Sequence, residues 1–330
     1  MRAVDRYRRQ AFQVILGSKP LRVRCTMTSP TPAISIAPTA EGFVVSEDGQ
    51  HVLFYQRETK RFDEAHSRSH YIHPLYGLDG ELLTEEFPYD HPHHCGIYWA
   101  WHQVWIGEKR IGDAWSLQDF AWDVQDVKVI TAGSYAALEA EVFWTSPLWT
   151  DGQGAHKPLV RETAVIRVYR ASRDMRKIDF DIRLVALEDG MRIGGSENAK
   201  GYGGYCTRVP LPDDLQFVSS GGDVDPTTEP VEAGPWMDFS GTFGEAGRVS
   251  GLAILCHPSV PGFPQPWILR RKTSMQNPVY PGPHPVALRR EDPLVLRYRL
   301  VVHRGAGREL DLDHLQAEYG AEGQDETESK

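Results

Sequence analysis

Apolar and polar residues alternate in several separate stretches of the chain. The clearest stretch is 177–187, where the apolar and charged residues occupy alternate positions: Ile178, Phe180, Ile182 and Leu184 against Asp179, Asp181 and Arg183. A period of two residues is typical of a β-strand that buries one face. Similar patterns predict strands at 122–130, 135–144, 161–170, 252–256 and 294–302.

Turn residues between these strands favour an antiparallel arrangement. The segments 43–45 and 51–55 flank an Asp48-Gly49 pair, which predicts a β-hairpin. Helical patterning is scarce, and its best candidate is 310–319. The 23 prolines and 30 glycines fall mostly between strands and fit long irregular loops. We therefore predict an all-β fold, a large antiparallel β-sandwich with few helices, as a single domain over 30–317.

The two ends of the chain differ from this domain in composition. Residues 1–29 are rich in arginine and are expected to form a disordered basic leader, with Met1 and Met27 as alternative starts. Paired arginines before a short apolar run resemble an export signal, but no small-residue cleavage site follows. Residues 318–330 hold five acids against one lysine and are expected to form a disordered acidic tail.

Composition narrows the class of partner. The net charge of −9 argues against nucleic acid, because phosphate binding needs a basic surface. No stretch approaches the ~18 apolar residues of a transmembrane helix, so no membrane span is expected. The four cysteines are widely spaced without a CxxC pair, which argues against a disulfide framework or a zinc ribbon. We expect a cytoplasmic protein that binds a small molecule, and its oligomeric state stays open.

Seven of the thirteen histidines lie between residues 66 and 102, with Asp90, His91, His93 and His94 in one short segment. In extended chain His91 and His93 share one face, which would suit a metal ion with Asp90 as a third ligand. The same rings could instead exchange protons with a substrate, with Asp90 orienting one of them. A third possibility is a set of structural hydrogen bonds that fixes a loop. The sequence leaves all three open.

A second cluster is the glycine-rich segment 194–204, which carries Glu197, Asn198 and Tyr202 on a loop that follows a strand. Five glycines in eleven positions permit positive φ and close backbone approach. The segment lacks the spacing of a phosphate-binding loop, and a plain strand-linking turn is the alternative. Arg208, on the next apparent strand, could pair with a carboxylate or grip a sugar hydroxyl.

The C-terminal part offers three isolated candidates. His257 ends a strand, while Trp267 and Asn277 lie in the proline-rich stretch 258–285. A flat indole can stack on the apolar face of a pyranose, although Trp267 could equally belong to the core. The sequence contains no serine nucleophile elbow and no HExxH motif.

Four short motifs resemble a bacterial family known as PmoA-like, which is named after methane oxygenase and is otherwise a domain of unknown function. They read HPLYG at 73–77, DHPHH at 90–94 before Gly96, GYGG at 201–204 and HPS at 257–259. Members commonly have a basic residue where this chain has Cys95. The methane oxygenase subunit is a multi-helix membrane protein, so the family name does not describe this chain. The resemblance implies a β-sandwich similar to galactose-mutarotase-like folds, with relatives beside genes of sugar metabolism.

We therefore expect a carbohydrate-active enzyme that uses histidine and glutamate as acid and base on a sugar or keto-sugar, for epimerisation, elimination or hydrolysis. The expected catalytic residues are His73, His93, His94, Glu197 and His257. The expected substrate-binding residues are Asp90, Trp99, His102, Asn198, Tyr202, Arg208, Trp267 and Asn277. No cofactor is predicted, although a divalent metal on His91, His93 and Asp90 is an alternative. A non-catalytic sugar-binding module is the other alternative.

Overall fold

The structure is a computed structural model, and it describes residues 34–244 and 247–322. These residues belong to one unit. The predicted leader at 1–29 lies outside the described residues.

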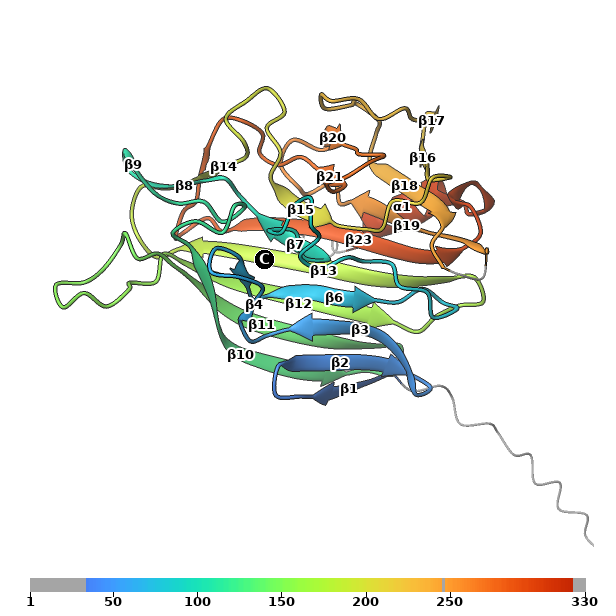
Figure 1. The fold of residues 1–330 in the computed structure, drawn as a ribbon, viewed down its shortest axis with the longest axis horizontal. Helices are drawn as coiled ribbons and strands as arrows, with labels where there is room; N and C mark the ends of the chain where they lie inside the picture. Colours follow the sequence, from blue (N-terminus) through green and yellow to red (C-terminus); the bar gives the residue numbers. More distant parts are fainter. Residues whose placement is uncertain (1–33, 245–246, 323–330) are drawn as a thin grey trace, which may run out of the picture. The chain divides into compact units, whose positions relative to one another are not determined.

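Two large antiparallel sheets dominate the described part of the chain (Figure 1). The six-stranded sheet contains, in spatial order, β1 (Ile34–Pro38), β2 (Gly42–Glu47), β3 (Gln50–Gln56), β6 (Tyr71–Leu75), β7 (Ile97–Ala100) and β15 (Gly204–Thr207). The nine-stranded sheet contains β10 (Ala121–Thr131), β11 (Tyr135–Thr145), β12 (Val160–Tyr169), β13 (Met175–Ala186), β23 (Leu294–Arg304), β19 (Val249–Cys256), β18 (Trp236–Thr242), β16 (Gln216–Ser219) and β17 (Gly222–Asp223).

Smaller sheets form within the segments that connect the strands of the two large sheets. One has four strands, β22 (Val286–Ala287), β14 (Met191–Gly194), β8 (Gln103–Ile106) and β9 (Lys109–Gly112). Two others are short pairs, β20 (Trp267–Ile268) with β21 (Asn277–Pro278), and β4 (Lys60–Arg61) with β5 (Ser67–Arg68).

The two large sheets face one another across a shared aromatic core. The Phe180 ring on β13 lies 5.2 Å from the Tyr205 ring on β15 and 6.4 Å from the Trp99 ring on β7, measured between centroids. Tyr205 in turn stacks on Tyr298 of β23 at 4.6 Å. Since these contacts join opposite sheets, the molecule is a β-sandwich, and the predicted fold class is confirmed.

The apolar positions of the alternating pattern are buried in the core, as predicted. Ile178, Phe180, Ile182 and Leu184 of β13 are fully buried. The predicted hairpin is also present, because β2 and β3 pair on either side of Asp48 and Gly49. Both residues have positive φ, 52° and 79°, as a tight two-residue hairpin turn requires.

The helix prediction is shifted, and this moves the boundary of the predicted tail. Helix α1 spans Leu312–Ala321, after the 3₁₀ turn η1 (Gly307–Glu309). The side chain of Asp311 accepts the His314 amide and caps the N-terminus of α1. The expectation that the disordered tail begins at 318 is therefore wrong for 318–322, and 323–330 lie outside the described residues.

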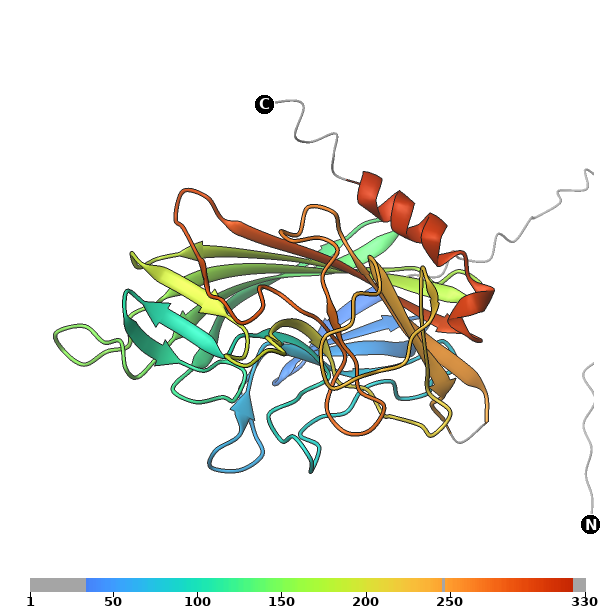
Figure 2. The same ribbon diagram turned by 90° about the horizontal axis from the view of Figure 1, so that it is seen from above.

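Packing explains why this acidic end is ordered. Tyr319 and Leu315 of α1 are buried against Leu255 and Val301 on the outer face of the nine-stranded sheet (Figure 2). The buried Arg299 guanidinium also binds Asp179 and Glu322 at 2.6 and 2.7 Å. Among the described residues, no helix has the length and apolar character needed to cross a membrane.

Candidate functional site

Four loops meet around a cavity of about 380 Å³. They are the segments beside β7, after β9, between β14 and β15, and between β20 and β21. The lining residues are His91, His93, His94, His102, Trp115, Ser116, Lys200, Tyr202, Arg270, Thr273, Ser274 and Met275. The volume falls within the roughly 300–1,000 Å³ of small-molecule sites. The cavity thus brings together four of the histidines singled out in the sequence.

Asp90 anchors the histidine segment to the loop before β21. Its carboxylate accepts two hydrogen bonds from the Arg208 guanidinium, at 2.7 and 3.0 Å, and one from the Ser274 amide at 2.9 Å. It also binds Nδ1 of His91 at 2.8 Å. Burial opposes its ionisation, but the hydrogen bonds from His91 and Arg208 outweigh burial and hold the pKa of Asp90 below its usual value. Asp90 and Arg208 therefore position the loop and do not line the cavity.

Glycines let the backbone approach closely at two points next to the cavity. Gly96 has a φ of 55°, and a Cβ there would lie 1.9 Å from the Ile72 carbonyl oxygen of β6. Gly201 has a φ of 58°, and a Cβ there would lie 2.5 Å from Pro283. A side chain at Gly96 would push the histidine segment away from β6, and one at Gly201 would push the Tyr202 loop away from Gly282 and Pro283.

His94 is the most buried of the lining histidines. Only 1% of its surface is exposed, yet neither ring nitrogen has a hydrogen-bond partner among the described residues. Its ring stacks on His91 at 4.8 Å and meets His93 edge to face at 4.4 Å. Burial lowers the pKa of His94 and, helped by the charge of His91, lowers the pKa of His93 to about 3. Both rings are therefore neutral near pH 7, each with one donor and one acceptor.

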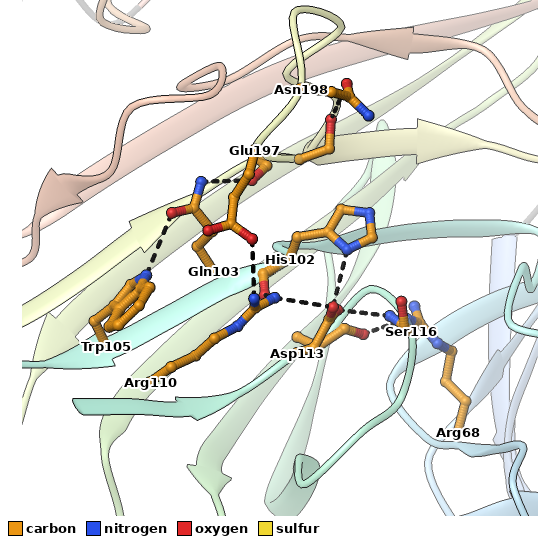
Figure 3. A network of polar contacts seen from close by, with 12 residues as sticks. Arg68, His102, Gln103, Trp105, Arg110, Asp113, Ser116, Glu197 and Asn198 are labelled. Carbon is orange, nitrogen blue, oxygen red and sulfur yellow. Dashed lines mark hydrogen bonds and ion pairs between the residues drawn. The ribbon is translucent and has the colours of Figure 1, made fainter.

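His102, which also lines the cavity, forms a pair with Asp113 (Figure 3). Its Nδ1 lies 3.0 Å from Asp113 Oδ2, while the Ser116 amide donates to Oδ1 at 2.8 Å. Arg110 donates to both the Asp113 carboxylate and the His102 carbonyl, at 3.2 and 2.6 Å. Nε2 of His102 is buried and has no partner among the described residues. The carboxylate thus fixes the ring and leaves one nitrogen available.

Aromatic rings enclose this pair. Trp115 stacks on His102 with ring centroids 5.4 Å apart, and Tyr202 meets His102 edge to face at 5.1 Å. Tyr202 is half-buried, and burial together with the Asp113 charge raises the pKa of its hydroxyl. The hydroxyl therefore stays protonated near pH 7 and can donate a hydrogen bond into the cavity.

The donor set does not fit the metal site considered from the sequence. The Asp90 oxygens already accept from Arg208, Ser274 and His91. Of the two predicted histidine ligands, His91 already binds Asp90 through Nδ1, and its ring meets that of His93 edge to face with centroids 5.6 Å apart. Among residues 34–244 and 247–322, no cluster of three or more His, Cys, Asp or Glu side chains has positions suited to a metal.

Two predicted catalytic histidines lie away from the cavity lining. His73 binds the Thr84 hydroxyl at 3.0 Å, and burial lowers its pKa. His257 binds Ser259 at 2.7 Å and the Glu322 carbonyl at 3.1 Å, and packs on Tyr319 of α1. The expectation that both would share a cleft with the 91–94 segment is therefore wrong. Their partners give both rings structural roles.

Three predicted substrate-binding residues are instead part of the core. Trp99 and Trp267 are buried and donate their indole N–H groups to Glu162 and to the Gly234 carbonyl. Asn277 is fully buried and binds the backbone of Gly203 and Tyr205. Neither indole can stack on a sugar in the cavity, whereas Asn277 holds the loop that carries Tyr202.

Glu197 and Asn198 lie on the surface beside the cavity. Glu197 pairs with Arg110 at 3.0 Å, and its side chain is 59% exposed (Figure 3). Asn198 accepts from the Ser196 hydroxyl and the Lys200 amide, which shapes the loop. Neither residue lines the cavity.

Sequence patterns did not single out four of the groups that complete the site. They are Asp113, Trp115, Arg270 and Ser274. The cationic run 270–272 inside a proline-rich stretch was the one available signal. Asp113 and Trp115 follow β9 without any motif, and only the fold brings them to His102.

Two other cavities offer less chemistry. One of about 590 Å³ is lined by Asp79 and Arg176 among others, but Arg176 pairs with Glu47 and Asp79 pairs with Arg304. Another, of about 490 Å³, has a proline-rich wall and shares Lys200 with the histidine cavity. We therefore treat the histidine cavity as the candidate active site.

Comparisons with known proteins identify a family but no activity. No curated protein matches the sequence. One solved structure that aligns with the chain is the GH36 alpha-galactosidase AgaA from Geobacillus stearothermophilus in complex with stachyose. Its identity is 11% and its TM-score is 0.26, over 83% of this chain and 40% of that protein, so it carries no functional argument. The resemblance to the PmoA-like family stays a prediction. Residues 43–317 match a family of unknown function, DUF6807, and the chain belongs to that family.

Proposed function

We propose that this protein is an enzyme that transfers protons on a sugar or keto-sugar held in the histidine cavity. The observation that carries the proposal is the Asp113–His102 pair, whose free Nε2 is buried beside the Tyr202 ring. A carboxylate-oriented imidazole with one open nitrogen is suited to act as a general base near neutral pH.

Each group has a distinct part in such a reaction. Asp113 accepts a hydrogen bond from Nδ1–H of His102, which leaves the Nε2 lone pair free to take a proton from a carbon next to a carbonyl. The Tyr202 hydroxyl donates a hydrogen bond to the carbonyl oxygen as negative charge develops there. Epimerisation follows when solvent water delivers a proton to the other face of the carbon and His102 releases its own proton to solvent. Elimination follows when a β-oxygen substituent leaves and takes the proton from His102.

The absence of carboxylates from the described lining favours these two reactions over glycoside hydrolysis. Hydrolysis of a glycosidic bond normally uses two Asp or Glu side chains on either side of the scissile bond. Asp90 and Asp113 lie behind the lining and are held by Arg208 and Arg110. Neither is placed to reach a glycosidic oxygen directly.

The remaining histidines supply recognition. His93 and His94 are neutral, and no hydrogen bond within the described residues engages the nitrogens of His94. Sugar hydroxyls can both donate and accept, so they match neutral imidazoles well. A buried nitrogen without a hydrogen bond costs free energy. A hydrogen bond from a sugar hydroxyl to this nitrogen would therefore contribute more to the binding free energy than the same bond at the surface.

Solvent exchange tests the proposal whichever product the reaction forms. The protein would be incubated in D₂O with a panel of aldoses, ketoses and keto-sugars, and loss of C–H signals would be followed by NMR. We expect exchange with wild type and a loss of about 10²–10⁴-fold in His102→Asn.

The matched control is His314→Asn, because His314 pairs with Glu318 on the exposed side of α1. It should exchange protons at the wild-type rate. Sugar binding without any exchange would overturn the enzyme proposal and leave a sugar-binding module.

A further inference from the structure

The cavity carries positive charge that no lining carboxylate balances. Lys200 and Arg270 both line it, and no Asp or Glu does. We infer that the sugar bound here carries an anionic group, a carboxylate or a phosphate, held by Lys200 and Arg270. This inference rests on the proposed function and names the substrate class of the same site.

Arg270 is held rigidly by neutral groups. Its guanidinium donates to the carbonyls of Thr227, Thr228 and Leu269, at 2.8, 3.1 and 2.8 Å. The buried Gln276 side chain accepts the Arg270 amide and donates to the Arg270 carbonyl, both at 2.8 Å. Carbonyl oxygens orient the guanidinium but leave its full charge in place. The charge of Glu229 acts on Arg270, but the two side chains form no ion pair in the described part of the chain.

Lys200 is the second cation. It lies in the loop between β14 and β15, and its ammonium has no ion-pair partner within residues 34–244 and 247–322. Its backbone is fixed, because its amide donates to the Asn198 side chain at 3.0 Å. Two separate loops therefore direct unneutralised cations to one cavity.

The other charged groups around the cavity do not cancel this field. Asp90 is engaged by Arg208, and Asp113 by Arg110. The buried Arg68 adds a further positive charge near the histidines, with its guanidinium 4.4 Å from the Tyr98 ring. The surroundings therefore favour an anion, since charge-assisted hydrogen bonds in a partly buried site are stronger than those between neutral groups.

An anionic substituent would also assist the proposed proton transfer. Arg270 lies close enough to Tyr202 for its charge to act on the phenol, and Tyr202 contacts His102. A carboxylate on the carbon that loses its proton would therefore have a cation nearby. That cation would stabilise the negative charge that develops when His102 takes the proton.

Calorimetric titration with matched sugars tests the inference by binding alone. The probes are glucuronate and galacturonate, glucose 6-phosphate, and neutral glucose and galactose. We expect at least one acidic sugar to bind about 10- to 100-fold more tightly than its neutral parent. The uronates and the phosphate ester form separate arms, and the tighter arm identifies the anion.

Charge-removing variants should reduce this preference. Lys200→Met and Arg270→Met should each weaken acidic-sugar binding about tenfold or more and leave neutral-sugar binding nearly unchanged. Arg270→Lys keeps a charge and should retain part of the preference, which guards against misfolding of Arg270→Met. Matched controls are Lys272→Met and Arg271→Met, because these neighbours do not line the cavity.

Several outcomes would overturn the inference. They are equal binding of acidic and neutral sugars, no binding of any acidic probe, and loss of the preference in the control variants. If acidic sugars bind with the expected preference but no C–H exchange occurs, the proposed function fails and the inference stands. If neutral sugars exchange and acidic ones do not bind, the inference fails and the proposed function stands.

Discussion

The Glu162–His70 pair in the core and the Asp113–His102 pair at the cavity are chemically alike but differently completed. Both join a carboxylate to an imidazole, at 2.8 and 3.0 Å. In the core, the second nitrogen of His70 binds the Tyr55 hydroxyl at 2.6 Å. At the cavity, the second nitrogen of His102 is buried without a partner among the described residues.

The surroundings of the two pairs widen this difference. Glu162 also accepts the indole N–H groups of Trp99 and Trp144, so one carboxylate ties strands of both large sheets together. Around His102, the rings of His94 and Tyr202 present groups to a cavity of about 380 Å³. A carboxylate–histidine pair by itself therefore does not indicate an active site. The feature that distinguishes His102 is a second ring nitrogen without a partner among the described residues, next to a cavity.

Removal of the core carboxylate should have the largest effect on stability. Glu162→Ala leaves three buried donors without an acceptor, on His70, Trp99 and Trp144. We expect the free energy of unfolding to fall by about 3–5 kcal/mol, measured by urea denaturation. Exchange activity per folded molecule should be unchanged.

Glu139→Ala on the neighbouring strand is the control, because Glu139 forms an exposed pair with Lys128. Its cost should be below about 1 kcal/mol. Equal costs for the two variants would contradict the view that the Glu162 network holds the sheets together.

The fold was predictable where the residue pattern repeats. The long strands β10 to β13 and β23 have ten residues or more each, so an alternation that covers only part of a strand still marks it in the sequence. The strands near the site, such as β7 and β15, have four residues each and are buried on every residue. A short run without alternation carries no period. The predictions therefore lacked β7 and gave β15 only as an apparent strand near Arg208, without bounds.

The sequence predicted which residue type forms the site, but not which side chains contact each other there. The density of histidines pointed to His93, His94 and His102, all of which line the cavity. His257 carries a similar His-Pro signal, yet Tyr319 of α1 packs on its ring, and Ser259 and the helix-capping residue Glu322 supply its hydrogen bonds. Asp113 and Arg270 are unremarkable in sequence, because their roles depend on which loops the sheets bring together. Contacts between side chains of different loops depend on the tertiary structure, and the spacing of residues along the chain does not predict them.

Replacement of a histidine should change the free energy of unfolding differently at the cavity and in the core, and His94 is the residue to replace at the cavity. His94→Leu removes two buried nitrogens that have no partner among the described residues, so the free energy of unfolding should stay constant or rise by about 1 kcal/mol. Binding of the preferred sugar should weaken about tenfold or more.

The matched control is His70→Leu, which removes the hydrogen bonds to Tyr55 and Glu162 and should destabilise the fold. The measurement is the urea midpoint of each variant, with calorimetry for binding. A His94→Leu variant as unstable as His70→Leu would show that His94 belongs to the scaffold.

Acid should weaken the fold partly through the cavity histidines. In the folded state the pKa of His93 is about 3 and that of His94 is also lowered, while an unfolded histidine titrates near ~6.5. As the pH falls from about 6.5 to about 3, the unfolded chain takes up these protons first. The contribution of these two neutral rings to the free energy of unfolding is therefore full above about pH 6.5 and is lost as the pH falls toward about 3.

The double variant His93→Gln with His94→Leu isolates this contribution. Its free energy of unfolding should depend less steeply on pH, by at most about 1.4 kcal/mol per pH unit for each histidine removed. His91, His102, His66 and Arg68 act on His93 and remain in both proteins, so the difference reports the removed rings. Identical slopes in wild type and variant would mean that water reaches both rings.

The smallest effect is expected at Glu197, which the sequence favoured as an acid or base. Its carboxylate pairs with Arg110 at 3.0 Å and is 59% exposed, so Glu197→Gln should change the free energy of unfolding by less than about 1 kcal/mol. Exchange activity should fall less than about threefold, because Arg110 stays bound to Asp113 and to the His102 carbonyl. A loss near 10²-fold in the same NMR assay would instead identify Glu197 as the proton-transferring group. The Asp113–His102 pair would then be scaffold like Glu162–His70, and the distinction between the two regions would fail.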